Sequence, residues 1–226
     1  PDDRAALIAF GDRHGFLIFE QPGNETTVAP VGHAHTRVHY ALPDYELRFA
    51  FAPTDFTQVN ADINRQMVPL ALELLEITPD ARVLDLFCGL GNFTLPIARE
   101  AQAVIGLEGA EPLVERGREN AAANGLENVR FEAADLTTMT PDAAFLGGPI
   151  DRVLLDPPRS GALEVLPAIA RLAPERIVYV SCGPATLARD VGELVHQHGY
   201  RLDKAGLMDM FPHTGHAEAI ALLTRT

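Results

Sequence analysis

The chain has 226 residues, 47% of them hydrophobic and 22% charged, and only two cysteines, which is the composition of a globular protein with one large domain and room for a smaller one. No apolar run approaches the roughly 20 residues of a membrane span, and two cysteines without metal-ligand spacing argue against a disulfide framework, so we expect a cytoplasmic protein without a membrane partner. The net charge of −13, taken alone, argues against nucleic acid as a partner, because phosphate groups are bound by basic surfaces.

Residues 1–55 differ in pattern from the rest of the chain. Short alternating runs at 16–19 and 47–51 are separated by turn-forming residues, which predicts a small α+β segment. Three histidines lie close together in this segment, at His33, His35 and His39. Because no cysteine or carboxylate stands beside them at ligand spacing, we interpret them as part of a solvated loop and predict no metal site.

From residue 56 onward, apolar runs alternate with helical patterns. The patterns predict strands at 82–87, 103–108, 129–133, 152–155 and 177–181. They predict helices at 60–75, 93–100, 111–124, 163–172 and 185–198. Two further strands, at 202–208 and 217–223, have no helix between them and can pair as an antiparallel hairpin. We therefore expect an α/β domain over 56–226 with a mostly parallel sheet, a C-terminal antiparallel hairpin and helices on both faces.

The first of these strands runs into a glycine turn, Gly89-Leu90-Gly91, and Glu108 ends the next strand. Glycines at such a turn let a ligand approach the backbone, and an acid at the next strand end can accept hydrogen bonds from both ribose hydroxyls. The pattern predicts a nucleoside ligand, either a dinucleotide or S-adenosylmethionine. Thr94 stands where the dinucleotide fingerprint has a third small residue, and Asp85 suits a cationic amino acid; both favour S-adenosylmethionine.

Two more residues near this turn have alternative roles. Asp135, at the end of the third strand, is placed to meet the edge of the adenine, or else it caps a helix or turn. Cys88 lies inside the glycine turn, and we interpret it as a small buried residue rather than a nucleophile.

The fourth and fifth strands end in segments that indicate base chemistry. Asp156-Pro157-Pro158 resembles the segment of base-modifying methyltransferases, but Arg159 follows where enzymes that methylate amino groups have an aromatic residue. Cys182 follows the fifth strand and precedes a helix. Ligands bind beyond the carboxyl ends of parallel strands, so both segments are expected to face one crevice. The helix dipole is expected to lower the pKa of the Cys182 thiol, which favours a nucleophile over a buried structural cysteine.

A cysteine nucleophile suits methylation of carbon 5 of uracil. That carbon is a poor nucleophile until a thiolate adds at carbon 6, and a base must later remove the proton from carbon 5. Glu218 opens the last strand within an apolar run, an unusual place for an ionisable group unless it is functional; the alternative is an acid at an exposed strand edge. His213 and His216 precede it and can position a phosphate or the glutamate.

Five motifs together resemble the RNA uracil-5 methyltransferases, and most closely the bacterial enzymes that make 5-methyluridine in large-subunit (23S) ribosomal RNA. They are FTQVN at 56–60, LDLFCGLGNFTLP at 84–96, LLDPPRSGA at 154–162, VSCGPATLARD at 180–190 and DMFPHTGHAE at 209–218. The resemblance covers nearly the whole chain and its motifs are specific in combination. It implies a Rossmann-like S-adenosylmethionine methyltransferase fold and methyl transfer to carbon 5 of a uridine.

The resemblance also implies roles for single residues. Cys182 matches the nucleophile and Glu218 the base. The positions that contact the cofactor are matched by Gln58, Phe87, Asn92, Glu108, Asp135 and Asp156. Gly183 departs from the pattern, because the ribosomal RNA enzymes have Asn there, and this leaves the target nucleotide open.

Members of this family usually have an N-terminal RNA-binding barrel, and some have an iron–sulfur cluster on four cysteines. We expect this chain to be the C-terminal catalytic part of a longer protein, with residues 1–55 as the remnant of a central domain and any cluster in the N-terminal part. That part would supply most of the basic RNA-binding surface, with a local patch here at Arg65, Arg159 and Arg189. We expect a monomer that acts on RNA.

Three alternatives remain open. The same chemistry on transfer RNA would use the same residues. A base methyltransferase that acts on an amino group would not need Cys182. A non-catalytic RNA- or cofactor-binding module would bind the cofactor without forming a covalent RNA adduct.

Overall fold

The computed structural model describes residues 2–32 and 37–226. Of the three clustered histidines, His33 and His35 lie outside the described residues, and His39 is exposed on a strand. In the described part of the chain, no group of three or more His, Cys, Asp or Glu side chains is arranged to hold a metal ion. None of the helices there has the length and apolar character that crossing a membrane requires.

A seven-stranded sheet forms the centre of the protein, in the order β10-β11-β9-β8-β5-β6-β7. Its five parallel strands are β5 (Arg82–Leu86), β6 (Ala103–Glu108), β7 (Val129–Ala133), β8 (Arg152–Leu155) and β9 (Arg176–Ser181). The last two strands, β10 (Tyr200–Met208) and β11 (Glu218–Arg225), pair as an antiparallel hairpin, and β11 also pairs antiparallel with β9. This confirms the expected α/β fold with a C-terminal hairpin.

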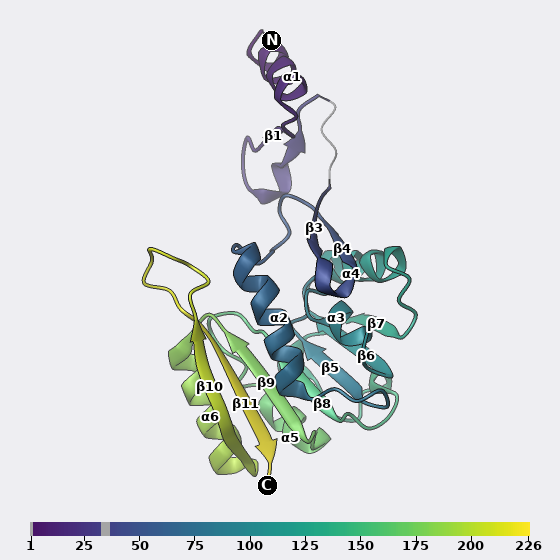
Figure 1. Cartoon of the computed structure of the whole chain (residues 1–226), viewed down its shortest axis with the longest axis vertical. Coiled ribbons are helices and arrows are strands. Elements are labelled where there is room, and N and C mark those ends of the chain that lie inside the picture. The colour runs from purple at the N-terminus through teal and green to yellow at the C-terminus, as the bar shows by residue number, and fades with distance from the viewer. Residues whose placement is uncertain (1, 33–36) are drawn as a thin grey trace.

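Helices cover both faces of the sheet because successive strand side chains point to opposite sides. In β8, Leu154 belongs to one hydrophobic cluster, while Val153 and Leu155 belong to the other. The first cluster includes residues of α2 (Ala61–Leu75), α3 (Thr94–Ala98) and α4 (Glu111–Ala123). The second includes residues of α5 (Leu166–Leu172), α6 (Pro184–Gln197) and the 3-10 helices η3 (Leu136–Thr138) and η4 (Ala144–Leu146). The two clusters place the sheet between two helical layers (Figure 1).

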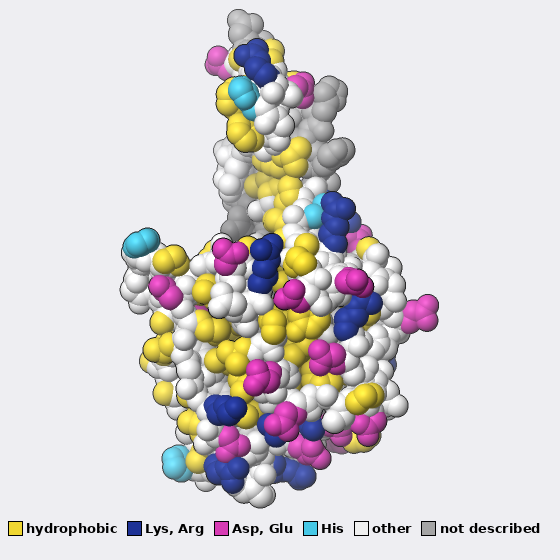
Figure 2. Space-filling model, viewed as in Figure 1, with side chains coloured by type: hydrophobic (Ala, Val, Ile, Leu, Met, Phe, Trp, Pro, Cys, Tyr) yellow, Lys and Arg dark blue, Asp and Glu magenta, His cyan; other side chains and the backbone are white. Residues whose placement is uncertain are grey.

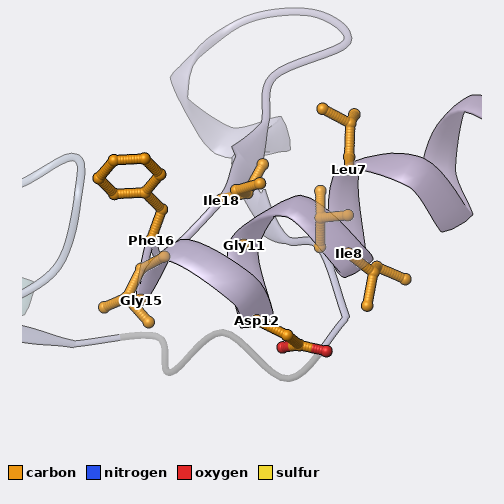
Figure 3. Close-up of a pocket in the computed structure, with 9 residues that line it drawn as sticks. Leu7, Ile8, Gly11, Asp12, Gly15, Phe16 and Ile18 are labelled. Carbon is orange, nitrogen blue, oxygen red and sulfur yellow. The ribbon is translucent and has the colours of Figure 1, made fainter.

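The first residues form an arm that stands away from the sheet (Figure 1). It contains α1 (Asp2–His14), β1 (Phe19–Glu20), the 3-10 helix η1 (Glu25–Thr27) and β2 (Ala29–Pro30). Of the apolar run at 16–19, only Phe19 lies in a strand. A cavity of about 270 Å³ lies between α1 and the segment before β1, lined mostly by apolar side chains (Figure 3). Apart from Asp12, its lining offers no ionisable side chain.

A second hairpin joins the arm to the sheet. It consists of β3 (Val38–Leu42), the 3-10 helix η2 (Pro43–Tyr45) and β4 (Leu47–Phe51). Asn120 of α4 pairs with the backbone of Ala50, accepting a hydrogen bond at 2.8 Å and donating one at 3.1 Å. Phe49 is fully buried in the same cluster as α2 and α4. The hairpin therefore packs with the sheet and its helices, although it precedes residue 56; the division of the chain at residue 55 stays a prediction.

Charged side chains are mixed on the surface. On the face shown in Figure 2, Lys and Arg are scattered among Asp and Glu rather than gathered into one basic area. This agrees with the acidic net charge of the chain, and it means that any contact with a polyanion has to be local.

Candidate functional site

The principal cavity, of about 820 Å³, lies at the carboxyl ends of the parallel strands. In Figure 1 this end of the sheet faces the arm. It also carries the loop 209–217, because β11 runs antiparallel to β9 and therefore starts at the end where β9 stops. Its walls come from the segments after β5, β6, β7, β8 and β9, from the start of β11 and from the segment before α2. Seven of the eight predicted site residues line it: Gln58, Phe87, Glu108, Asp135, Asp156, Cys182 and Glu218.

The glycine turn after β5 exposes its backbone to this cavity. Gly89 and Gly91 have φ of 55° and 101°, in the left-handed region that glycine adopts without strain. Phe87 also has a positive φ of 62°, which is unfavourable for a residue with a side chain. A Cβ at Gly91 would lie 3.0 Å from the Phe131 ring, so this glycine is required by packing as well as by backbone conformation.

Glu108 is held at the end of β6 by backbone donors. Its two carboxylate oxygens accept hydrogen bonds from the amides of Gly89, at 3.1 Å, and Ala110, at 3.0 Å. These bonds fix the carboxylate beside the glycine turn and leave it further lone pairs on the cavity side. Such an arrangement can accept hydrogen bonds from two adjacent hydroxyl groups of a ribose.

Asp135 has the capping role that the sequence offered as one of its two alternatives, and it also lies at the cavity. Its Oδ1 atom accepts hydrogen bonds from the Thr137 amide, at 2.9 Å, and hydroxyl, at 2.6 Å, so it caps the 3-10 helix η3. These bonds to Thr137 lower the pKa of Asp135. The residue also lines the cavity. Contact with an adenine stays a prediction.

Asn92 lies apart from the other predicted residues. Its side chain exchanges two hydrogen bonds of 2.9 Å with Asn64 of α2, and it accepts one of 3.0 Å from the Tyr40 hydroxyl. It is absent from the cavity lining. In this structure Asn92 ties the glycine turn to α2 and β3, and its contact with a cofactor stays a prediction.

Acidic side chains gather at the base of the cavity. Burial raises the pKa of Asp156 well above its usual range, and the charges of Glu218 and Asp85 add to the effect. Burial also raises the pKa of Glu218 and of Asp85, each to about 7. Asp85 lies in β5 just before the glycine turn; one of its oxygens accepts a hydrogen bond from the Thr94 hydroxyl, and the other has no hydrogen-bond partner among the described residues. A ligand with positive charge would stabilise the ionised forms of these groups.

Cys182 and Glu218 lie side by side because of the strand register. Ser181 of β9 pairs with Ala219 of β11, so the next residues along the two antiparallel strands are Cys182 and Glu218. Both line the cavity, and Glu218 is only 3% exposed. A thiol and a carboxyl group are therefore presented together to one ligand.

The expected lowering of the Cys182 pKa is wrong. Burial and then the charge of Glu218 raise the pKa of the thiol, whereas the Arg159 guanidinium, through a hydrogen bond and its charge, lowers it. The start of α6 does not outweigh the acidic surroundings. Thiolate formation in this site depends on the guanidinium of Arg159, or on a change in the charge of the neighbouring carboxyl groups.

The arginines expected to contact phosphate differ in their surroundings. Arg159 lines the cavity and contacts Nδ1 of His216 at 2.6 Å. Arg189 instead bonds to Asp190 and to the Ser160 carbonyl. Arg65, on α2, lies 3.6 Å from Asp62 and is about half exposed. Only Arg159 of the three lines the cavity.

Two aromatic residues of the cavity were not identified from the sequence. Phe56 is 70% exposed at the cavity, and Phe211 lines it from the 209–217 loop. An exposed phenyl ring at a pocket is a surface on which a planar base can stack. Phe56 stands two positions before Gln58 in the motif at 56–60. Alternation indicates strands and charge indicates ionisable sites, but neither pattern singles out an exposed aromatic ring.

A model of a known protein family matches residues 31–226, and its description is tRNA (Uracil-5-)-methyltransferase. The chain belongs to this family. The 23S rRNA (uracil(1939)-C(5))-methyltransferase RlmD of Alkalilimnicola ehrlichii is 62% identical over 99% of this chain and 50% of its own length. The RlmD protein of Xanthomonas oryzae pv. oryzae is 53% identical over the same shares. The chain thus spans about half the length of the curated relatives it matches.

Solved structures agree with this membership. The tRNA (uracil-54, C5)-methyltransferase of Pyrococcus abyssi, determined with S-adenosyl-L-homocysteine, superposes with a TM-score of 0.74 at 27% identity, over 92% of this chain and 50% of that one. The TYW2 protein of M. jannaschii, determined with AdoMet, has a TM-score of 0.66 at 18% identity, over 93% of this chain and 94% of that one. The second likeness supports the Rossmann-like methyltransferase fold alone.

Proposed function

We propose that this family member is the catalytic part of an enzyme that transfers a methyl group from S-adenosylmethionine to carbon 5 of a uridine in RNA. The observation that carries the proposal is the placement of Cys182 beside Glu218, in the same cavity as the Glu108 carboxylate. A nucleophile, a base and a nucleoside-binding acid in one cavity match the three requirements of this reaction.

The cavity fits the cofactor by volume and by charge. Its volume of about 820 Å³ lies within the roughly 300–1,000 Å³ of ligand pockets. Glu108 would bind the ribose hydroxyls, and Asp156, joined to Gln58 by a 3.3 Å hydrogen bond, would face the cationic end. Burial raises the pKa of Asp156 and of Glu218. A positively charged ligand bound beside them would stabilise the ionised carboxylates and so lower both pKa values. Bound there, S-adenosylmethionine would supply the methyl group from its sulfonium.

Two side chains, Cys182 and Glu218, carry out the proposed steps on the uracil ring. The Cys182 thiolate adds to carbon 6 of the uracil, forming a sulfur–carbon bond and moving the electron pair of the ring double bond onto the enolate. After carbon 5 has been methylated, the Glu218 carboxylate removes its proton and the thiolate leaves, which restores the double bond. With a pKa of about 7, Glu218 is partly ionised near neutral pH and can accept that proton.

We propose ribosomal RNA as the substrate because the two RlmD relatives, 62% and 53% identical to this chain, are named as 23S rRNA enzymes. The family description and the Pyrococcus abyssi structure name transfer RNA, so the same chemistry on transfer RNA is the second candidate. Mass spectrometry of RNA from a strain that lacks the gene distinguishes the two: we expect loss of one 5-methyluridine from 23S ribosomal RNA, and its loss from transfer RNA instead would contradict the substrate.

Ribose recognition by Glu108 predicts a measurable loss of affinity. Calorimetry should detect binding of S-adenosylhomocysteine to this chain by itself. Glu108→Ala removes a charged acceptor and should weaken binding by about 1.5–3 kcal/mol. Glu111→Ala, on the exposed first turn of α4, is a suitable control. Equal affinity of the Glu108 variant and the wild type would contradict the assignment.

The buried Glu218 carboxyl predicts a pH-dependent stability. Its pKa in the folded chain, about 7, lies above the ordinary value of 4.5. The folded state therefore holds the proton more tightly than the unfolded state, and this contribution to stability, complete at low pH, is lost as pH rises through about 7. Glu218→Gln removes the effect. Its Tm should exceed that of the wild type at alkaline pH, by about 2–4 °C for each kcal/mol recovered, and the difference should shrink in acid.

Thermal denaturation of both proteins without ligand across this pH range measures the effect. Asp85 titrates in both proteins, so the difference in Tm reports Glu218 together with its effect on the pKa of the neighbouring Asp156. A difference in Tm that does not vary with pH would show that the Glu218 carboxyl is not destabilised by ionisation.

A further inference from the structure

The loop between β8 and α5 brings Arg159 to the cavity without regular secondary structure of its own. Residues 156–165 contain no helix or strand, and Ser160 and Arg159 are exposed. A loop of this kind moves readily unless other elements hold its backbone. The hydrogen bonds that other elements make to the backbone of residues 159–162 come from the first two turns of α6. The loop is also contacted at side chains, at Asp156 by Gln58 and at Arg159 by His216.

Side chains of three α6 residues bond to the backbone of this loop. The Thr186 hydroxyl lies within hydrogen-bond distance of two carbonyl oxygens, that of Arg159 at 3.0 Å and that of Gly183 at 2.8 Å. The Arg189 guanidinium donates to the Ser160 carbonyl at 2.9 Å. Further along, the Ala162 amide donates to Asp190 at 2.7 Å. The loop backbone is thus bonded to α6 at three of four consecutive residues.

Asp190 is the buried centre of these contacts. Its side chain is fully buried, and besides the Ala162 amide it accepts hydrogen bonds from the Tyr179 hydroxyl at 2.6 Å and from Arg189 Nε at 2.8 Å. Tyr179 is a fully buried residue of β9. A buried carboxylate with three donors is rigid, so the loop is fixed relative to β9, the strand that Cys182 follows.

Two glycines allow the close approach. A Cβ at Gly161 would lie 2.5 Å from an Asp190 oxygen, and one at Gly183 would lie 2.6 Å from the Thr186 hydroxyl. Gly161 also has a φ of 84°, which favours glycine. Where relatives are expected to have Asn at position 183, the Thr186 side chain would have to move. The fit between loop and helix in this chain therefore depends on Gly183.

We propose that Thr186, Arg189 and Asp190 form a clamp that fixes the loop 158–162 on α6 and so holds Arg159 in the cavity that Cys182 also lines. These are positioning residues, because they act through Arg159 and do not touch the reacting atoms. The clamp rests on the proposed function only in that Cys182 is taken as the nucleophile. Because α6 begins at Pro184, two residues after Cys182, one helix sets the position of both the sulfur and its cationic neighbour.

The clamp matters because opposing charges surround the sulfur. Arg159 lowers the pKa of the thiol, and Glu218 from β11 and Asp156 from the end of β8 raise it. If the guanidinium moves away from the cavity, nothing opposes the increase that the two carboxyl groups cause in the pKa of the thiol. Loss of the clamp should therefore reduce the thiolate fraction at neutral pH and slow every reaction of the sulfur.

The test is the pH profile of Cys182 alkylation by iodoacetamide in this chain, read by mass spectrometry of the two cysteine peptides. Buried Cys88 is the internal reference. Thr186→Val removes the hydroxyl at similar volume, Thr186→Ser keeps it, and Arg159→Met shows the full effect of the guanidinium. We expect alkylation near neutral pH to slow about three- to tenfold in Thr186→Val and in Arg159→Met, and Thr186→Ser to restore the wild-type profile.

Arg189→Met is a second variant that breaks the contact with Ser160, and it should shift the profile in the same direction. Thermal denaturation and S-adenosylhomocysteine binding establish that each variant is folded. If both Thr186→Val and Arg189→Met keep the wild-type profile, the clamp is overturned. This holds whether Arg159→Met shifts the profile or leaves it unchanged. None of these readings needs RNA, so failure of the proposed function would appear separately, as the lack of an RNA adduct on the wild-type enzyme.

Discussion

Replacing Cys182 with alanine is expected to abolish both methyl transfer and the covalent complex with RNA. Without the thiolate no bond forms to carbon 6, and carbon 5 stays too weak a nucleophile to take the methyl group. We expect activity to fall by at least about 10³-fold, as for other enzymes that lose a covalent nucleophile. The measurement uses the full-length protein, a target RNA containing 5-fluorouridine, which blocks proton removal from carbon 5, and a denaturing gel.

Cys88 supplies the matched control for this experiment. It is the only other cysteine, and it is buried in the glycine turn with a strongly raised pKa because of burial. Cys88→Ala should still form the adduct, since Cys88 Sγ is buried in the hydrophobic cluster beside α3 and α4. A covalent complex formed by Cys182→Ala, or one lost in Cys88→Ala despite normal folding, would reverse the roles of the two cysteines. Full activity of Cys182→Ala would instead favour methylation of an amino group.

Replacing Glu218 with glutamine is expected to produce the opposite defect. Attack by Cys182 and methylation of carbon 5 remain possible, but the base that removes the carbon 5 proton is gone. Turnover should fall by about 10²–10⁴-fold, and the methylated adduct should accumulate as a protein–RNA complex stable on a denaturing gel. Unlike the wild type, the variant should trap ordinary uridine RNA without fluorine.

The control is Glu193→Gln, a partly exposed acid of α6 that lies 3.6 Å from His198 and outside the cavity lining, which should turn over without accumulating the complex. Mass spectrometry of the trapped peptide should show Cys182 bonded to a methylated uridine. A Glu218→Gln enzyme that binds cofactor but forms no complex would falsify the assignment of Glu218 as the base. An unmethylated adduct would place the defect before methyl transfer.

The strand and helix pattern from residue 82 onward was predictable because each element is long enough to show its period. Parallel strands buried on both faces, such as 103–108, appear as continuous apolar runs. The arm was less predictable, since β1 and β2 are two residues each and are too short to show an alternating pattern. Cavity residues at strand ends, such as Glu108 and Asp156, were predictable because topology places all those ends together.

The chemistry of these residues was less predictable than their positions. A helix start predicts a lowered thiol pKa, but the pKa of Cys182 depends on three groups from two other segments, Asp156 and Arg159 after β8 and Glu218 at the start of β11. Asn92 stands in the predicted cofactor motif, yet its amide pairs with Asn64, 28 positions earlier in the chain. Side-chain contacts of this kind depend on how α2 packs against the turn, which local periodicity does not encode.

By itself, the sequence determined the family, the parallel sheet, the C-terminal hairpin and the two residues, Cys182 and Glu218, that suit uracil chemistry. Only the tertiary structure decided that β11 enters the sheet between β9 and β10, in a register that pairs Ser181 with Ala219. A hairpin can join a sheet through either strand, and a shift of one residue would turn Glu218 to the opposite face. The packing of both faces of the sheet sets this strand order and register, and together they place the Glu218 carboxyl group beside the Cys182 sulfur.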